Sequence, residues 1–257
     1  MTDRPTLDVA TPPGGWGMPW PNVAEIETAL PHETWTLVGG LMTQLHAFRA
    51  GIDAVRPTND VDIVLHVETT RGVAATATTA LEGLGYALTP PIDPREGSAH
   101  RFVRDDARVD VITTAPDVVD VLAADHAAPS VTEKLRGHAM VAVEGGTQAL
   151  RRTFNARLAV TPGRTTTISV PDVFGAVVLK SAAYRTDSRD PERHLHDAAS
   201  LLGCLEDPYA ERERFTGSDR QRLETLRVNL PDGARAWRAL PAAHRRNGQA
   251  ALRILTA

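Results

Sequence analysis

Apolar and polar positions predict strands and helices in mixed order along the first two thirds of the chain. Within residues 35–65, a short apolar run ends at Gly39-Gly40, an amphipathic segment continues through Phe48, and a second apolar run begins at Asp60. This pattern predicts a strand, a glycine turn, a helix, a loop and a second strand in succession.

The rest of this part of the chain is predicted to hold short elements. Helices are expected at 23–30, 70–84 and 117–125, and strands at 86–88, 100–104, 108–112, 140–143, 150–158 and 166–170. Glycines at 145 and 146 predict a hairpin turn between two of those strands. Residues 1–22 are too rich in Pro and Gly for a regular element, and we expect a strap whose Trp16 and Trp20 pack on the body of the protein.

From Pro171 onward the pattern becomes mainly helical. Pro171 suits the first turn of a helix, a second helix follows Arg189, and Ser218, Pro231 and Pro241 mark further helix starts.

The predicted fold class is therefore α/β (α+β), with a mixed sheet followed by helices. The expected divisions are a strap at 1–22, a first domain at 23–165 and a mainly helical C-terminal domain at 166–257.

Composition is that of an ordinary globular protein. The chain has 257 residues, of which 42% are hydrophobic and 23% charged. No apolar run approaches the roughly 20 residues of a membrane helix, and the first residues lack a signal-peptide pattern. Cys204 is the only cysteine and cannot form an internal disulfide, which favours a reducing compartment. We expect a cytoplasmic protein with no membrane partner.

The net charge of -4 hides an asymmetry. From Glu211 onward there are ten arginines and five acids, a balance of +5, which leaves the first 210 residues at -9. The basic tail fits either helices with solvated arginine faces or a surface that follows the phosphates of an RNA. The sequence leaves both interpretations open.

The stretch at 35–65 also carries candidate chemistry. Side chains on a strand alternate, so Asp60 and Asp62 point to one face, where their mutual repulsion favours a bound divalent cation such as Mg²⁺. Gly39 and Gly40 let the backbone approach a phosphate, and amides opening the helix near Leu41 are donors for it. The alternative is an ordinary glycine turn beside a solvated strand end.

Asp110 is a third candidate ligand. It lies inside the predicted strand 108–112, where a lone carboxylate is disfavoured unless it is paired or liganded. If this strand lies beside Asp60 and Asp62, three carboxylates converge and suit one or two Mg²⁺ ions. The alternative is an exposed face of an edge strand.

Lys180 and Asp197 stand out in the helical part. The chain has only two lysines against 26 arginines, so a lysine inside an apolar helix indicates a compact charge for a phosphate, with chance as the alternative. Asp197 alone fits a surface ion pair with Arg193, one helical turn away.

Two groups of motifs resemble a known family. Gly39-Gly40, a helix and then R-P-T-N-D-V-D at 56–62 resemble the first motif of the polymerase-beta-like nucleotidyltransferase superfamily. Its Arg-x-Thr-x-Asp-x-Asp form is most similar to the AbiEii (MenT-like) toxin nucleotidyltransferases of type IV toxin–antitoxin systems. K-S-A-A-Y-R at 180–185 and D-P-E-R-H-L-H-D-A-A-S-L-L at 190–202 resemble later motifs of that family.

The resemblance implies a polymerase-beta-like core and metal-dependent transfer of a nucleotidyl group from a nucleoside triphosphate (NTP) to an acceptor. The implied acceptor is RNA, such as the 3′ end of tRNA, and the implied protein partner is a cognate antitoxin. The implied catalytic residues are Asp60, Asp62, Asp110 and Asp197, the first three also as metal ligands. The implied nucleotide-binding residues are Gly39, Gly40, Arg56, Thr58 and Lys180, with Arg185 and Arg193 as weaker candidates.

The chain departs from the family pattern at one position, and two other functions are compatible with the sequence. Many members have Ser where this chain has Gly40, so a hydroxyl contact to the phosphates is missing. A small-molecule nucleotidyltransferase of the aminoglycoside or lincosamide type shares the Gly-Gly and Asp-x-Asp motifs, and the acidic first 210 residues permit its cationic substrates. A non-catalytic nucleotide-binding protein is the third possibility. For either enzyme, the active site is expected in a cleft between the two domains.

Overall fold

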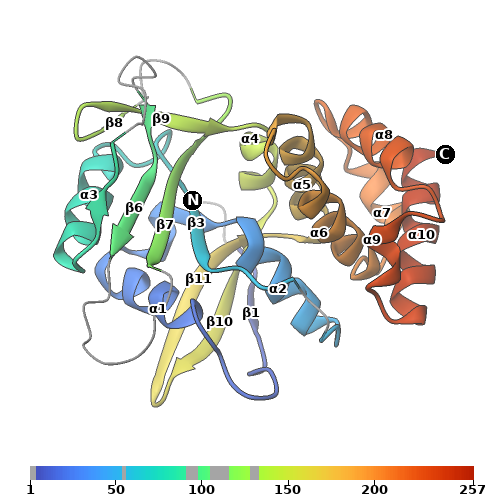
Figure 1. The fold of residues 1–257 in the computed structure, drawn as a ribbon, viewed down its shortest axis with the longest axis horizontal. Helices are drawn as coiled ribbons and strands as arrows, with labels where there is room; N and C mark the ends of the chain where they lie inside the picture. The colour runs from blue at the N-terminus through green and yellow to red at the C-terminus, as the bar shows by residue number, and fades with distance from the viewer. Residues whose placement is uncertain (1–3, 54–55, 91–97, 105–115, 128–132) are drawn as a thin grey trace. The chain divides into compact units, whose positions relative to one another are not determined.

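The computed structural model describes residues 4–53, 56–90, 98–104, 116–127 and 133–257 (Figure 1). Two compact units are each built from several segments of the chain. Unit 1 comprises Met1–Leu41, Thr58–Val143 and Phe154–Val170, and unit 2 comprises Met42–Pro57, Glu144–Thr153 and Pro171–Ala257. The predicted domains 23–165 and 166–257 are continuous in sequence, whereas these units are not.

Unit 1 contains a mixed sheet whose strands run in the order β2-β3-β7-β6-β4. Strand β3 is parallel to β7, and the pairs β2–β3, β6–β7 and β4–β6 are antiparallel. Strand β9 is parallel to both β7 and β5, and antiparallel to β8. The bounds are β2 Trp35–Leu37, β3 Asp60–Leu65, β4 Ala87–Leu88, β5 Ser98–Ala99, β6 Arg101–Arg104, β7 Asp117–Ala124, β8 Lys134–Leu135 and β9 His138–Val143. The prediction of an α/β protein with a mixed sheet is confirmed.

The central strand β7 corrects the sequence analysis, which predicted a helix over residues 117–125. Val118, Val119 and Val121 favour an extended backbone, and the segment is hydrogen-bonded along β3 on one side and β6 on the other. Pairing with two neighbouring strands outweighs the helical preference of the alanines that follow.

A second, three-stranded sheet has the order β1-β10-β11, with bounds β1 Thr6–Asp8, β10 Thr153–Thr161 and β11 Arg164–Pro171. The expectation that residues 1–22 hold no regular element is wrong, because β1 pairs in parallel with β10. The predicted hairpin around Gly145 is also wrong: helix α4 (Gly146–Leu150) follows β9, and β10 joins a different sheet from β9.

Helices and a short 3₁₀ turn accompany these sheets. Their bounds are α1 Trp20–Ala29, η1 His32–Thr34, α2 Gly39–Arg49 and α3 Val73–Gly83, and α1 packs against α3. Trp16 and Trp20 are buried against each other, with ring centroids 4.7 Å apart, as expected for a strap that packs on the protein. Helix α2 begins in unit 1 and continues into unit 2.

Unit 2 is mainly helical, and its remaining helices are α5 Val173–Thr186, α6 Glu192–Gly203, α7 Pro208–Glu213, α8 Asp219–Asn229, α9 Arg235–Arg238 and α10 Ala242–Thr256. Helix α6 packs against both α5 and α10, and α8 packs against the same two helices (Figure 1). Pro171 ends β11 instead of opening a helix. Asp172 is the N-cap of α5, and its carboxylate accepts a hydrogen bond from the Gly175 amide at 2.8 Å. Of the helices in the described part of the chain, none is long and apolar enough to cross a membrane.

Candidate functional site

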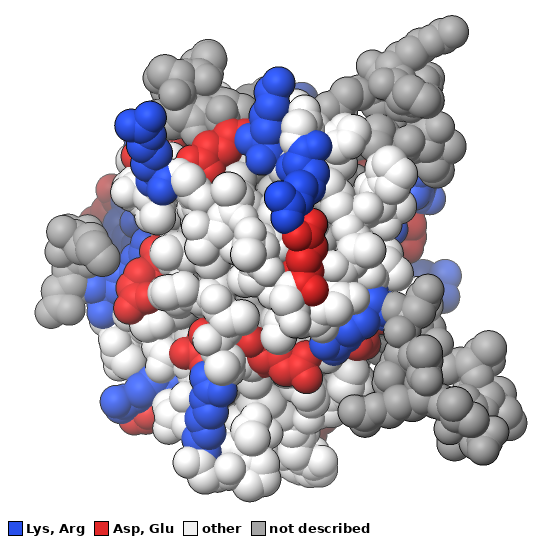
Figure 2. Space-filling model, turned by 90° about the vertical axis from the view of Figure 1, so that its left-hand side faces the viewer, with Lys and Arg blue, Asp and Glu red and all other residues white. Residues whose placement is uncertain are grey.

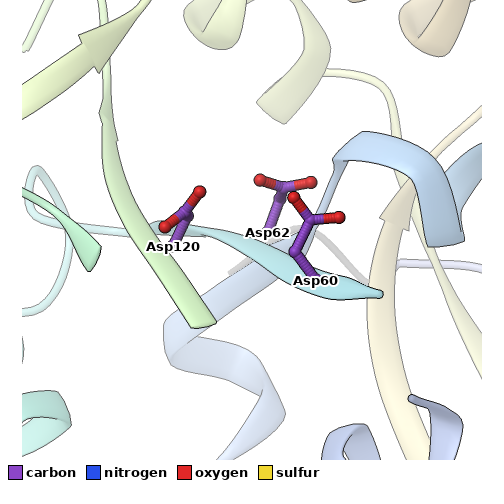
Figure 3. A group of neighbouring side chains, drawn as sticks. All are labelled: Asp60, Asp62 and Asp120. Atoms are coloured by element: carbon purple, nitrogen blue, oxygen red, sulfur yellow. The ribbon is translucent and has the colours of Figure 1, made fainter. Parts of the chain in front are cut away.

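Three aspartates of unit 1 bring their carboxylates together. Asp60 and Asp62 rise from β3 and Asp120 from the adjacent strand β7 (Figure 3). Each contributes an oxygen atom to a group whose members all lie within 4.8 Å of one another. Asp120 is buried, and the other two are partly exposed.

Strand register explains this convergence. Asp60 and Asp62 are two positions apart and therefore share one face of β3, while Val61 and Ile63 point into the core and are fully buried. In the parallel ladder Asp62 lies opposite Asp120, so the third carboxylate emerges on the same face. A regular feature of strand pairing thus gathers three negative charges.

Gly39 and Gly40 open helix α2 directly against this cluster. Gly39 has a φ of 68°, and a Cβ atom there would lie 1.7 Å from an Asp62 carboxylate oxygen. A Cβ atom on Gly40 would lie 2.7 Å from Thr58 Oγ1. Both positions therefore require glycine, and the helix start approaches the acids more closely than any other residue would allow.

Two further side chains contact the aspartates. Thr58 Oγ1 donates a hydrogen bond of 2.5 Å to Asp60, which fixes one carboxylate oxygen. Arg101, which lies opposite Asp120 in the antiparallel ladder of β6 and β7, donates from Nε and Nη2 to the two oxygens of Asp120, at 2.9 and 2.7 Å. Hydrogen bonding to Asp120 raises the pKa of Arg101, and the charges of Asp60 and Asp62 add to this effect.

The donor set suits a hard divalent cation. Mg²⁺ binds oxygen ligands at about 2.0–2.1 Å, so two ligand oxygens on opposite sides of the ion are about 4.2 Å apart. Adjacent ligand oxygens of such an ion are about 2.9 Å apart. The oxygens of Asp60, Asp62 and Asp120 lie within 4.8 Å of one another, so side-chain rotations would have to bring them closer to share one ion. These three residues could therefore hold a metal ion.

Sequence reasoning missed Asp120 and chose Asp110, which lies outside the described residues. The two acids have the same local signal, because each stands between two valines (Val109 and Val111, Val119 and Val121). The argument that a carboxylate inside a strand needs a partner applies equally to Asp120, but the helix predicted over 117–125 concealed it. Asp120 lies beside the strand of Asp60 and Asp62, where the third acid was expected.

Other predicted site residues belong to unit 2 and form a buried ionic group. Lys180 on α5 donates to Asp197 on α6 at 2.6 Å, and both side chains are at most 5% exposed. Arg56 Nε lies 3.5 Å from the other oxygen of Asp197. Burial alone would raise the pKa of Asp197, but the charges of Lys180 and Arg56 outweigh burial and lower it, so Asp197 stays ionised.

The remaining candidates are nearer the surface of unit 2. Arg185 is exposed in the last turn of α5. Arg193 does not pair with Asp197 as its spacing suggested; its guanidinium lies 2.9 Å from Asp187, which also contacts His194 at 3.0 Å. Arg56, Lys180 and Asp197 are therefore the predicted residues that unit 2 brings together.

Charged side chains of both signs are mixed on one face of the molecule (Figure 2). Figure 2 shows a face on which, among the described residues, basic and acidic side chains are interspersed rather than gathered into one patch.

Comparisons with known proteins found no matching family model, no matching curated protein and no matching solved structure. The residues and their geometry therefore carry the functional argument.

Proposed function

We propose that this protein is a metal-dependent nucleotidyltransferase that moves a nucleotidyl group from an NTP to RNA. The observation that carries the proposal is the convergence of Asp60, Asp62 and Asp120 beside a helix start that requires glycine. Charged phosphates and divalent cations are the ligands that these two features suit when they adjoin.

Each part has a chemical role in this proposal. Asp60, Asp62 and Asp120 hold the cation, and Thr58 orients Asp60 through its hydrogen bond. The bound cation would supply neutralising charge for the triphosphate and its pyrophosphate leaving group. The start of α2 is the positive end of the helix dipole, so it is suited to lie against phosphate oxygens.

The geometry of Lys180 and Asp197 indicates a structural role before a role in binding the substrate. A lysine held at 2.6 Å by a buried carboxylate has its charge largely compensated, so we assign the pair first to the stability of unit 2. The resemblance to AbiEii-like toxins extends the proposal to the 3′ end of tRNA as acceptor and to a cognate antitoxin as partner.

The test is transfer of label from each α-³²P NTP, with Mg²⁺, into total tRNA and separately into aminoglycosides and lincosamides. We expect labelled tRNA with the unmutated chain and at least a 100-fold loss with Asp60→Asn, which removes one ligand charge. Asp8→Asn is the matched control, because Asp8 is an exposed carboxylate on β1, in the other sheet. Label in a drug instead would make the protein a small-molecule nucleotidyltransferase, and no transfer to any acceptor would contradict the proposal.

A further inference from the structure

Arg101 holds the third carboxylate of the acidic cluster. Its guanidinium donates to both oxygens of Asp120, and its side chain is 44% exposed whereas that of Asp120 is 9% exposed. The three strands β3, β7 and β6 thus present Asp62, Asp120 and Arg101 as neighbours in one row across the sheet. A positive charge therefore lies beside the same carboxylates that would hold a cation.

The position of Arg101 makes it a competitor for that cation. A bidentate guanidinium uses the carboxylate oxygens of Asp120 for its own hydrogen bonds and brings a unit positive charge next to the cluster. Three carboxylates within 4.8 Å repel one another, and Arg101 relieves part of that repulsion while no metal is bound. A divalent ion at the same carboxylates would instead be repelled by Arg101.

We propose that Arg101 is a tethered counter-cation that occupies Asp120 in the metal-free protein and must release it when a divalent cation binds. This inference rests on the metal site of the proposed function and adds a built-in exchange step to it. Metal affinity is then set by two opposing quantities, the attraction of three carboxylates and the cost of displacing one guanidinium. Arg101 is a positioning residue in this scheme, since it acts through Asp120.

A second ion pair offers a matched control. Arg157 on β10 lies opposite Asp8 on β1 and donates to both of its oxygens, at 2.8 and 2.7 Å. This pair repeats the cross-strand, bidentate geometry of Arg101 and Asp120, and the two arginines are similarly exposed. It lies in the three-stranded sheet, away from the acidic row, so its loss should not change metal affinity.

The experiment is calorimetric titration of the full chain with Mn²⁺, for the unmutated protein and for Arg101→Gln, Arg101→Lys, Arg157→Gln and Asp60→Asn. A unit charge about 6 Å from a divalent ion weakens binding roughly tenfold even in water. We therefore expect Arg101→Gln to lower the Mn²⁺ dissociation constant about tenfold and Arg157→Gln to leave it unchanged. Arg101→Lys keeps the charge, so it should stay near the unmutated value, and Asp60→Asn should bind much more weakly.

Thermal unfolding with and without Mn²⁺ gives a second readout. Without metal, Arg101→Gln removes a positive charge from beside the three carboxylates, so added Mn²⁺ should raise its unfolding midpoint more than that of the unmutated chain. Equal or weaker Mn²⁺ binding by Arg101→Gln, with binding still lost in Asp60→Asn, would overturn the exchange while leaving the metal site in place. No binding by any of the five proteins would refute the metal site itself, and the inference with it.

Discussion

Gly39 and Gly40 show how single residues shape the candidate site. Each occupies a position where a Cβ atom would collide with a side chain of the candidate site, Asp62 in one case and Thr58 in the other. The second contact gives a packing reason for glycine at position 40. Thr58 fills the space that a side chain at position 40 would need, and it uses its hydroxyl to hold Asp60.

We therefore predict that Gly40→Ser weakens the site instead of restoring a missing hydroxyl. The new Cβ would lie 2.7 Å from both Cβ and Oγ1 of Thr58, so Thr58 or the helix start must move and the hydrogen bond to Asp60 is lost. We expect a cost of about 1–3 kcal/mol in the free energy of unfolding, as for overpacking elsewhere, together with weaker Mn²⁺ binding.

Gly83→Ala is the control for that substitution. Gly83 ends helix α3, and a Cβ atom there would meet no other described atom within 4 Å, so alanine should be neutral or slightly stabilising in urea unfolding. Unchanged stability and Mn²⁺ affinity in Gly40→Ser would show that Thr58 has room to move and would remove the packing argument for glycine.

Helices α5 and α6 are joined by the buried pair of Lys180 and Asp197. Removing one partner of a buried pair leaves an uncompensated charge, which typically costs about 3–5 kcal/mol, whereas replacing both with apolar residues costs far less. Arg56 at 3.5 Å compensates only part of the charge of Asp197. Substituting Lys180 and Asp197 therefore tests whether these residues stabilise the protein, bind phosphate or do both.

We predict that Lys180→Met and Asp197→Leu each destabilise the protein by about 3–5 kcal/mol and that the double variant is more stable than the sum of the two losses implies. Urea unfolding of the four proteins measures the coupling. Additive losses would mean that the pair does not act as a unit. Nucleotidyl transfer by the double variant then separates the roles, because a stable but inactive protein would point to a direct contact with the substrate.

The elements that the sequence predicted well are those with a strong local pattern. The strand–glycine–helix–strand order around Asp60 follows from alternation and from glycine punctuation, and both are local. The position of β7 in the sheet and the placement of β9 and β10 in different sheets depend on which strands pair. Strand pairing joins residues far apart in the sequence, so a short stretch of sequence does not predict it. Asp120 was missed for this reason: its role depends on lying opposite Asp62.

The same limit applies to contacts formed by charge. Spacing along α6 favoured a pair between Arg193 and Asp197, but the structure pairs Arg193 with Asp187 and Asp197 with Lys180. A helical spacing identifies possible neighbours, and packing against another helix decides which partner is reached.

A row of buried and partly buried hydrogen bonds connects strands β11 and β2, which belong to different sheets of unit 1. Arg4 donates to Ser169 on β11 at 2.9 Å, and Ser169 and Thr36 on β2 are 2.9 Å apart. Thr36 lies 2.8 Å from His66 Nε2, and His66 Nδ1 lies 2.7 Å from the carbonyl oxygen of Glu33. Because the Glu33 carbonyl can only accept, Nδ1 of a neutral His66 donates to it and Nε2 accepts from Thr36. Thr36 then has no second proton, so Ser169 donates to Thr36.

The position of His66 in this row of hydrogen bonds makes the stability of the protein depend on pH. Burial lowers the pKa of His66 to about 4, against its ordinary value of 6.5, because the charged imidazolium would lose its solvation, and the charge of Arg4 adds to this effect. Between pH 6.5 and 4 the unfolded chain therefore binds a proton that the folded chain does not. The contribution of neutral His66 to the free energy of unfolding is fully present above pH 6.5. It falls by up to about 3 kcal/mol as the pH decreases to 4.

We predict that His66→Gln, which cannot be protonated, flattens the pH dependence of the unfolding midpoint between pH 6.5 and 4. Burial also lowers the pKa of His46, to about 4, and that of His194, so the variant should keep part of the original slope. His126→Gln is the control, because the side chain of His126 is 72% exposed. An unchanged slope in His66→Gln would mean that His66 accepts a proton in the folded protein and that the hydrogen-bond chain between the sheets can reverse its direction.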